Sequence, residues 1–245
     1  MDEKKIAVIG AGIMGISALR RLSENKRFLL TCFERNCDLG GLWVYTDQTE
    51  NDVYGRKINS AMYSNLQTNL PKQLMQLEGF PMDEECPSFP THTDVLAYIR
   101  KVADQCDIRK YIKFNTEVQL VKPNDNHVEE FDAVIVCNGN CSIPNYPMID
   151  NEKEFGGLVI HSIRYRRPEL FAGLNVAVLG ASHSGMDISH DISKHAKTVY
   201  LCHRGSKLPT LLPANVIEKT SGFKRFTSSS IILDDNDVIQ IDAVI

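Results

Sequence analysis

The chain has 245 residues, of which 43% are hydrophobic and 24% charged, and this near-average composition excludes disordered, collagen-like and coiled-coil proteins. Its 27 Lys and Arg against 31 Asp and Glu give a formal net charge of −4, so we expect no nucleic-acid partner. Strand-sized apolar runs predict no transmembrane segment, and seven cysteines without a signal peptide favour a cytoplasmic protein with free thiols. A peripheral association with the endoplasmic reticulum is left open.

The first predicted elements are a strand, a glycine-rich turn, a helix and a second strand within about 30 residues, which is a βαβ unit. The first strand covers residues 5–9, and the turn runs from Gly10 to Gly15. Apolar residues three apart over 16–22 predict the helix, which closes at about residues 23–25. The second strand covers 28–33 and is followed by Glu34.

The glycine turn has the spacing of a dinucleotide-binding site. Gly10 permits the tight turn, Gly12 lets a pyrophosphate approach the backbone, and Gly15 lets the helix pack on the strand. The N-terminus of the helix adds N–H groups and a positive dipole end for the phosphates. Glu34 follows 24 residues after Gly10, where a carboxylate accepts the ribose hydroxyls, so the first turn suits FAD or NAD.

The middle of the chain is predicted to be rich in loops. Residues 35–90 hold prolines at 71, 81, 87 and 90, and a loop region this long is usually functional. Thr93 is expected to cap a helix that runs to about Cys106. Further strands are expected at 118–121, at 133–137, which reads as fully buried, and at 158–161 within a proline-containing connector.

A second βαβ unit follows. The strand covers 176–179, the turn Gly180–Gly185, the helix 186–195 and the next strand 198–202. Ser182 replaces the middle glycine, and Arg204 lies 24 residues after Gly180, as Glu34 does after Gly10. A guanidinium pairs with the 2′-phosphate that a carboxylate would repel, so the second unit suits NADP. The alternative is an exposed arginine at a strand end.

Two such sites in one chain predict electron transfer from NADPH to a flavin. The close cysteine pairs, Cys32/Cys37 and Cys137/Cys141, lack the spacing of a catalytic dithiol, so structural thiols are favoured over a disulfide reductase. No close Cys/His spacing indicates zinc, and no Gly-x-Ser-x-Gly elbow is present.

Four segments resemble the flavin-containing monooxygenase family, the N,N-dimethylaniline monooxygenases. Residues 155–165, FGGLVIHSIRY, match its FxGxxxHxxxY fingerprint, and residues 40–43 resemble its GGxW segment. Residues 68–72 resemble its active-site loop, and 137–139 with Pro144 and Pro147 resemble its linker. Tyr165 stands where Baeyer–Villiger enzymes usually carry Trp, so oxygenation of ketones remains only a third hypothesis.

The resemblance implies an α/β fold of two Rossmann-type dinucleotide-binding units, three-layered, the second incomplete. The expected limits are 1–145 for an FAD-binding domain, 146–170 for a linker and 171–245 for an NADP-binding domain. FAD would contact Gly10, Ala11, Gly12, Ile13, Met14, Gly15, Glu34, Leu42, Trp43 and Asn69. NADP would contact Thr68, Asn69, Gly180, Ser182, Ser184, Gly185, Met186, Asp187 and Arg204. His161 and Tyr165 are expected to be structural, and no metal is expected.

The resemblance also implies the reaction. NADPH reduces the flavin, O₂ adds at flavin C4a, and the hydroperoxide oxygenates a soft nitrogen or sulfur of a small-molecule amine or sulfide, as in xenobiotic metabolism. Bound NADP⁺ and Asn69 would hold that intermediate, so Asn69 is the catalytic candidate. Its alternative is a turn residue before Leu70-Pro71. An oligomer is left open.

The end of the sequence raises a hypothesis of a different class. The last four residues, 242–245, repeat 132–135, whereas family members usually continue, and the stretch between 121 and 131 is also short. The alternative to a monooxygenase is therefore a truncated, catalytically incompetent isoform that only binds nucleotide.

Overall fold

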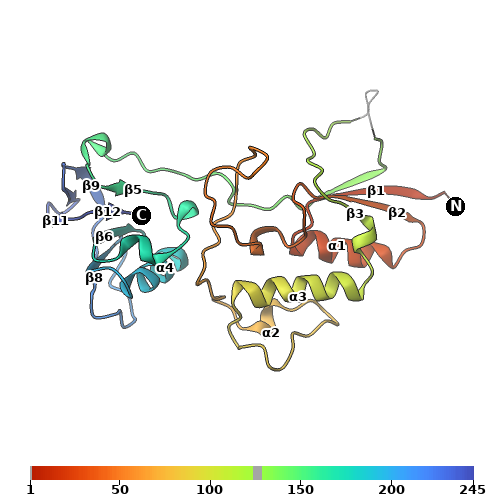
Figure 1. Ribbon diagram of the computed structural model, residues 1–245, viewed down its shortest axis with the longest axis horizontal. Coiled ribbons are helices and arrows are strands. Elements are labelled where there is room, and N and C mark those ends of the chain that lie inside the picture. The colour runs from red at the N-terminus through yellow and green to blue at the C-terminus, as the bar shows by residue number, and fades with distance from the viewer. Residues whose placement is uncertain (1, 124–128) are drawn as a thin grey trace. The chain divides into compact units, whose positions relative to one another are not determined.

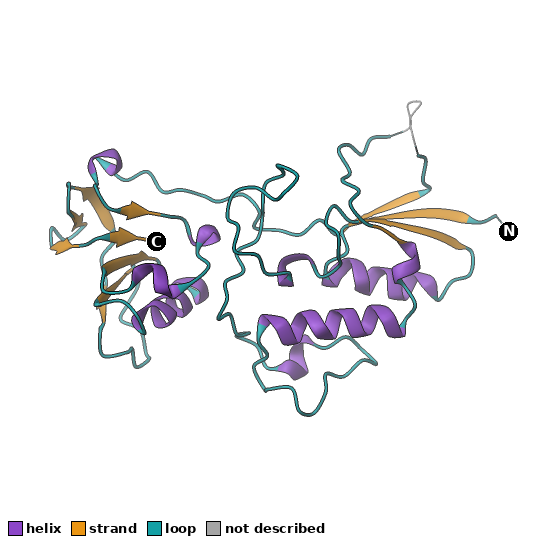
Figure 2. Ribbon diagram, in the orientation of Figure 1, coloured by secondary structure: helices purple, strands orange, loops and turns teal. Residues whose placement is uncertain are grey.

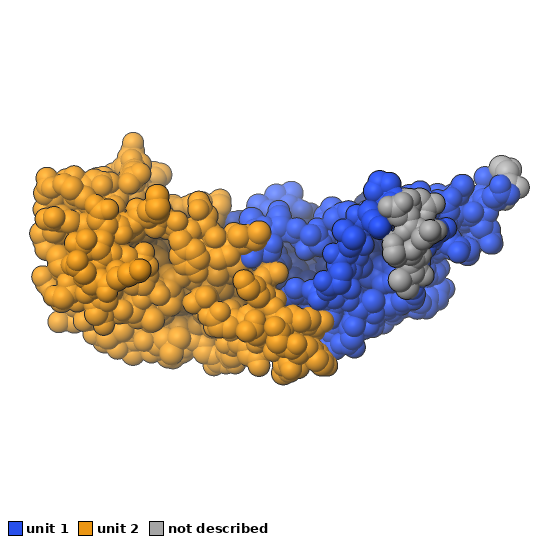
Figure 3. Space-filling model, turned by 90° about the horizontal axis from the view of Figure 1, so that it is seen from above, with its two compact units in different colours: residues 1–46, 66–142 blue, residues 47–65, 143–245 orange. Residues whose placement is uncertain are grey.

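The computed structural model describes residues 2–123 and 129–245, and it is an α/β protein with parallel sheets. The chain forms two compact units (Figure 3). Unit 1 contains residues 1–46 and 66–142, and unit 2 contains residues 47–65 and 143–245. Each unit has its own parallel sheet (Figures 1 and 2).

The sheet of unit 1 has the strand order β3-β2-β1-β4. Its strands are β1 (Lys4–Ile9), β2 (Phe28–Phe33), β3 (Ile112–Lys113) and β4 (Ala133–Val136), and all of them pair in parallel. The helices of the unit are α1 (Ile13–Ser23), α2 (Lys72–Met75) and α3 (His92–Gln105). The predicted strand 28–33 is confirmed, and the expected helix after the glycine turn is α1.

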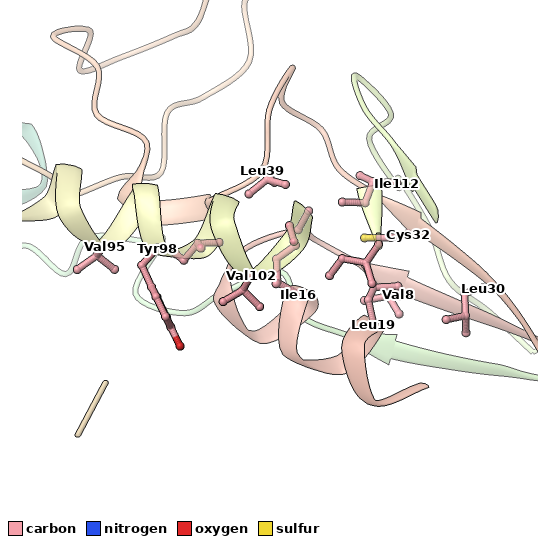
Figure 4. Close-up of a cluster of buried hydrophobic side chains, with 14 of the residues drawn as sticks. Val8, Ile16, Leu19, Leu30, Cys32, Leu39, Val95, Tyr98, Val102 and Ile112 are labelled. Carbon is pink, nitrogen blue, oxygen red and sulfur yellow. The ribbon is translucent and has the colours of Figure 1, made fainter. Parts of the chain in front are cut away.

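One hydrophobic core joins this sheet to its two long helices (Figure 4). Val8 of β1 and Ile16 and Leu19 of α1 are fully buried there. Val102 of α3 contributes from the neighbouring helix. The glycine turn between β1 and α1 is therefore fixed by a packed element on each side.

In unit 1 one predicted strand does not form, and another forms without its expected burial. No strand forms at 118–121, and the position beside β2 is taken by β3, in which Ile112 pairs with Cys32. Leu120 is instead 71% exposed. The strand expected at 133–137 forms as β4, but it is not buried, because it lies at the edge of the sheet and Val136 is 64% exposed.

The expected cap of α3 is also wrong by two residues. Thr91, not Thr93, is the N-cap: its side chain accepts from the backbone N–H of Asp94, whose carboxylate accepts from the backbone N–H of Thr91. This reciprocal pair is a capping box, and it satisfies two backbone donors at the start of the helix.

The sheet of unit 2 has the order β5-β12-β6-β7-β8, with all strands parallel. Its strands are β5 (Leu158–Val159), β6 (Asn175–Leu179), β7 (Thr198–Cys202), β8 (Val216–Lys219) and β12 (Ala243–Val244). Helix α4 (His183–Ser193) packs against β6, β7 and β8. It begins three residues before the predicted start at 186, because Ser182 of the turn is already its N-cap.

A small antiparallel sheet forms a further layer of unit 2. It consists of β9 (Phe223–Phe226), β10 (Ser230–Leu233) and β11 (Val238–Gln240). Phe226 and Ile231 of this sheet share a buried core with Ala177 and Val244 of the parallel sheet. Short 3₁₀ segments complete the described chain at Gly41–Trp43, Arg109–Tyr111, Glu152–Glu154, Ser162–Arg164 and Pro168–Phe171.

The two parallel sheets repeat one arrangement, since β4-β1-β2-β3 corresponds to β12-β6-β7-β8. The repeat extends to side chains. Asp132 accepts from the backbone N–H of Lys5 at 2.8 Å, and Asp242 accepts from the backbone N–H of Asn175 at 2.8 Å. The repeated four-residue segments thus form equivalent strands, each beside the strand that leads into the glycine turn of its unit. Within residues 2–123 and 129–245, no helix is long and apolar enough to cross a bilayer.

Candidate functional site

The two glycine turns have nearly the same backbone. Gly10 and Gly180 have φ angles of +98° and +109°, which favour glycine. A Cβ on Gly15 would lie 1.9 Å from the carbonyl oxygen of Gly10, and one on Gly185 would lie 1.8 Å from that of Gly180. The φ angle therefore favours glycine at the first position of both turns, and the packing of the turn requires glycine at the last position.

The middle position of the turn is different. Gly12 has a φ of −73°, and Ser182 a φ of −77°, so both backbones are ordinary. A Cβ on Gly12 would meet only Gly41, at 3.6 Å from its Cα, which is normal contact. Packing within unit 1 does not require a glycine here, and the open space is what a close pyrophosphate needs.

The helices that follow the two turns carry no side-chain cap. Neither Gly12 at the start of α1 nor Ser182 at the start of α4 makes a side-chain cap hydrogen bond, whereas α3 has the full capping box. The first N–H groups of a helix have no partner within it, and the dipole favours an anion there. Both turns therefore offer the donors and the field that bind phosphate.

Glu34 lies where the sequence predicts, beside the first turn. It is only 4% exposed at the end of β2. One carboxylate oxygen accepts from the backbone N–H of Ala11 at 2.8 Å, and the other accepts from that of Asn36 at 2.8 Å. Each oxygen keeps capacity for a further donor such as a ribose hydroxyl.

The Gly40-Gly41 segment crosses the same turn. The backbone N–H of Gly40 donates to the carbonyl of Ala11 at 3.0 Å. A Cβ on Gly41, whose φ is +56°, would lie 3.0 Å from the Cα of Gly12. Leu42 comes next and is 45% exposed, while Trp43 is half-buried against the core of unit 1. The structure thus brings the GGxW segment to the predicted FAD turn.

The Thr68–Asn69 loop is held within unit 1. The backbone N–H of Thr68 donates to the carbonyl of Pro90 at 2.9 Å, and its hydroxyl donates to the carbonyl of Leu70 at 2.8 Å. Thr68 is buried, whereas Asn69 is exposed. The hydroxyl proton of Thr68 is therefore used inside the loop, and the exposed Asn69 is the residue that presents its side chain to solvent.

The second turn borders a cavity of about 280 Å³ in unit 2. Among the residues predicted to contact NADP, the cavity is lined by Gly180, Ser182, Ser184 and Gly185. Met186, Asp187 and Arg204 do not line it. Instead, Asp187 accepts a hydrogen bond from the hydroxyl of Tyr63.

Arg204 follows β7 by two residues, and its side chain is 78% exposed. Its Nε donates to Asp234 at 3.2 Å. A Cβ on Gly222 would come within 2.6 Å of both this Nε and the Asp234 carboxylate, so a glycine there leaves room for the pair. An exposed pair of this kind adds little to stability, and a phosphate can replace or share it.

Comparison with known proteins identifies the family of this chain. A family model described as flavin-binding monooxygenase-like matches residues 3–129 and 122–210. The chain belongs to this family.

Individual members show how far the likeness extends. The chain is 35% identical to flavin-containing monooxygenase FMO GS-OX3 of Arabidopsis thaliana, a match covering 100% of the chain and 60% of the relative. It is 33% identical to trimethylamine monooxygenase of Pelagibacter ubique, covering 98% and 60% respectively. The structure of S-allyl-L-cysteine S-oxygenase from Allium sativum superposes with a TM-score of 0.88, at 28% identity, over 99% of the chain and 61% of that protein.

Membership of the flavin-binding monooxygenase-like family confirms four predictions. The recognised family and the α/β fold of Rossmann-type units are correct, and the family is one of flavin-dependent oxidoreductases. FAD and NADPH are confirmed as cofactors at the level of the family. The chain spans about 60% of the length of the curated relatives it matches.

The family fingerprint is explained by packing in unit 2. A Cβ on Gly157 would lie 2.3 Å from the carbonyl oxygen of Asp242, so the glycine is required. The ring of Phe155 packs on Phe226 at 5.2 Å between centroids. His161 accepts from the backbone N–H of Ile163 through Nδ1 at 3.1 Å. Each of these contacts serves the structure of the linker.

The last fingerprint residue, Tyr165, donates to the carboxylate of Asp191 at 2.7 Å. Desolvation raises the pKa of this buried phenol, and the adjacent carboxylate raises it further. The side chain is 1% exposed and links helix α4 to the linker.

Sequence reasoning missed two buried charged residues of unit 2. Asp191 is 4% exposed and also accepts from Asn65 at 3.1 Å. Arg166, also 4% exposed, donates to backbone carbonyls of four residues, which are Gln48, Ser60, Ile163 and Tyr165. Asp191 could have been noticed, because it falls next to Ile192 on the buried face of the predicted helix.

The properties of the cysteine thiols agree with the structural role predicted for them. All seven cysteines are free. Desolvation raises the pKa of Cys32 to about 12 and also raises the pKa of Cys137. A thiol with a raised pKa forms little thiolate near neutral pH and is a poor redox nucleophile.

Proposed function

We propose that the chain binds FAD at the turn of unit 1 and NADPH at the turn of unit 2, and that it serves oxygenation of nitrogen or sulfur in small molecules. The observation that carries this proposal is that two residues of opposite charge occupy equivalent positions in the two βαβ units. Glu34 and Arg204 both follow the strand after their turn, 24 residues from Gly10 and Gly180. A carboxylate accepts ribose hydroxyls, and a guanidinium binds a 2′-phosphate.

In unit 1, the pyrophosphate of FAD would lie on the backbone of residues 10–15, over the open space at Gly12 and against the uncapped start of α1. Glu34, held by two backbone N–H groups, would accept the ribose hydroxyls. Leu42 and Trp43 would contact FAD from the segment that crosses the turn. When bound, FAD would supply the redox chemistry, which no side chain of the described residues provides.

In unit 2, the turn from Gly180 to Gly185 would hold the pyrophosphate of NADPH. Ser184 is an exposed hydroxyl donor at this turn, and both Ser182 and Ser184 line the cavity. Arg204 would bind the 2′-phosphate. Met186 and Asp187 would contact the cofactor from the first turn of α4.

Asn69 is proposed as the residue that acts on the reacting oxygen. Its side chain is an exposed amide on a loop that two hydrogen bonds of Thr68 hold in place. An amide donates a hydrogen bond without titrating, so it can stabilise negative charge on oxygen over a wide pH range. Thr68 would support this loop and contact NADP.

The proposed substrates are small amines and sulfides. One relative is a trimethylamine monooxygenase and another an S-allyl-L-cysteine S-oxygenase, so both soft nitrogen and soft sulfur occur among the substrates in the relatives' names. Because the chain spans about 60% of these proteins, its own activity is part of the proposal.

The test is a spectrum followed by a reduction. The purified 245-residue chain should show flavin absorbance after incubation with FAD and gel filtration, and anaerobic NADPH should bleach it faster than NADH does. Aerobic turnover with trimethylamine or S-allyl-L-cysteine should then give the oxide. A folded chain that takes up no FAD would contradict the proposal for unit 1, and bleaching without product would contradict the oxygenation.

A further inference from the structure

The loop that carries Arg204 is hydrogen-bonded at both ends to the carboxylate of Glu218. His203 follows β7, and its side chain is 8% exposed, while Glu218 of β8 has a side chain that is 10% exposed. Nε2 of His203 lies 2.9 Å from Oε1 of Glu218. The same oxygen accepts from the backbone N–H of Leu208 at 2.7 Å. The first and last residues of the 203–208 loop are therefore both hydrogen-bonded to Glu218.

The contacts of His203 define its proton positions. The backbone N–H of Gly205 donates to Nδ1 at 3.1 Å, so Nδ1 is an acceptor. The ring proton must then be on Nε2, which donates to Glu218. The backbone of His203 is fixed as well, because its N–H donates to the carbonyl of Lys219 at 2.9 Å. Every hydrogen-bonding group of the ring has one defined partner.

Arg204 lacks comparable support of its own. Its side chain is 78% exposed, and its ion pair with Asp234 is an exposed one, which holds a flexible side chain weakly. The direction of the guanidinium thus depends on the backbone of the loop. That backbone is set by His203 immediately before it and by Leu208 four residues after it.

We propose that His203 and Glu218 are positioning residues that fix the 203–208 loop so that Arg204 meets the 2′-phosphate of NADPH. The inference rests on the proposed function, since it requires NADPH in unit 2. Neither side chain touches the phosphate. They determine the preference for a phosphorylated ribose by removing the freedom of the loop before the ligand arrives.

Two substitutions separate the bonds of His203. In His203→Asn, the amide oxygen can still accept from the N–H two residues on, as in an Asx turn, but it cannot reach Glu218. In His203→Gln, the longer amide can still donate to Glu218, but the acceptor for Gly205 is lost. His195→Asn is the matched control, because His195 is an exposed histidine of the same unit.

The experiment is calorimetric titration of the 245-residue chain with two probes. Adenosine 2′,5′-bisphosphate carries the 2′-phosphate, and adenosine 5′-monophosphate lacks it. We expect the unchanged chain and His195→Asn to prefer the bisphosphate. We expect each His203 variant to lose about threefold to tenfold of that preference, with the affinity for the monophosphate within about twofold. Circular dichroism melts verify that each variant is folded.

The outcomes distinguish the inference from the function beneath it. If the unchanged chain shows no preference for the bisphosphate, the proposed NADPH site fails first. If it does, and the His203 variants keep the full preference or weaken both probes equally, His203 is merely structural and the inference is overturned. In an Arg204→Ala background, His203→Asn should change the preference no further. A further loss there would also overturn the inference, because the effect would not pass through Arg204.

Discussion

The two Rossmann-type units of this flavin-binding monooxygenase-like protein combine nearly the same turn backbone with side chains of opposite charge. Both have a glycine in the left-handed region at the start of the turn, and both require the last glycine, because a Cβ there would lie within 2 Å of the first glycine's carbonyl oxygen. Glu34 follows one frame and Arg204 the other. The backbone thus favours or requires glycine at the first and last positions of both turns, whereas the residue after the following strand differs in charge between the two units.

The two charged residues also differ in how far they are buried. Glu34 is 4% exposed and bonded to two backbone N–H groups, so its carboxylate belongs to the frame of unit 1. Arg204 is exposed, and its support comes from the loop around it. Substitutions at the two positions should therefore differ in what they damage.

The largest effect is expected for Gly15→Val. Its side chain would collide with the carbonyl of Gly10, which is backbone and cannot move aside without opening the turn. We expect a loss of about 4 kcal/mol or more in the free energy of unfolding, together with the loss of FAD. The matched variant Gly12→Ala has room for its methyl group, so it should lose FAD while the unfolding free energy changes by less than about 1 kcal/mol. Equal stability losses in denaturant titrations would contradict the distinction.

The next largest effect is expected for Glu34→Arg. The substitution removes the acceptor of the Ala11 and Asn36 N–H groups and places a cation where the ribose hydroxyls would bind. We expect the chain to retain no flavin after gel filtration, and Glu34→Gln, which keeps one acceptor oxygen, to retain part of it. Unchanged flavin absorbance in Glu34→Arg would remove Glu34 from the site.

Much of this frame could be predicted from the sequence, because its signals are local. A glycine turn directly between a strand and a helix needs no distant partner to be recognised, and the strands 28–33 and 198–202 form where predicted. The failures share a different cause. Residues 118–121 have an apolar pattern, but Ile112 and Lys113 pair with β2 instead. No local sequence pattern indicates which of the two segments pairs with that strand.

The supporting residues of the candidate site could not be predicted for the same reason. Tyr165 meets Asp191 across 26 residues of sequence, and His203 meets Glu218 across 15. Each pair depends on the register between elements, which the fold sets and periodicity does not. The fingerprint predicted that Tyr165 matters, but only the structure shows its partner.

Arg204→Ala should produce a smaller and more selective effect. Losing charged hydrogen bonds to a phosphate costs about 1.5–3 kcal/mol, so the KM for NADPH should rise roughly tenfold to hundredfold. The KM for NADH should change by less than about threefold, since that cofactor has no 2′-phosphate. Lys224→Ala is the control, because it removes a different positive charge of unit 2. Equal rises for both cofactors would show that Arg204 does not read the phosphate.

The smallest expected effect concerns the middle of the second turn, where the two units differ by one side chain. Ser182 caps α4 without a side-chain cap hydrogen bond, so Ser182→Gly removes little that stabilises the helix. The added space would make unit 2 resemble unit 1, in which Gly12 leaves room for a pyrophosphate. If steric narrowing dominates, NADP⁺ should bind about twofold to fivefold more tightly in Ser182→Gly by calorimetry. Weaker binding would instead mean that the exposed Ser182 hydroxyl donates to the pyrophosphate, and the two turns would then bind their ligands differently despite one backbone.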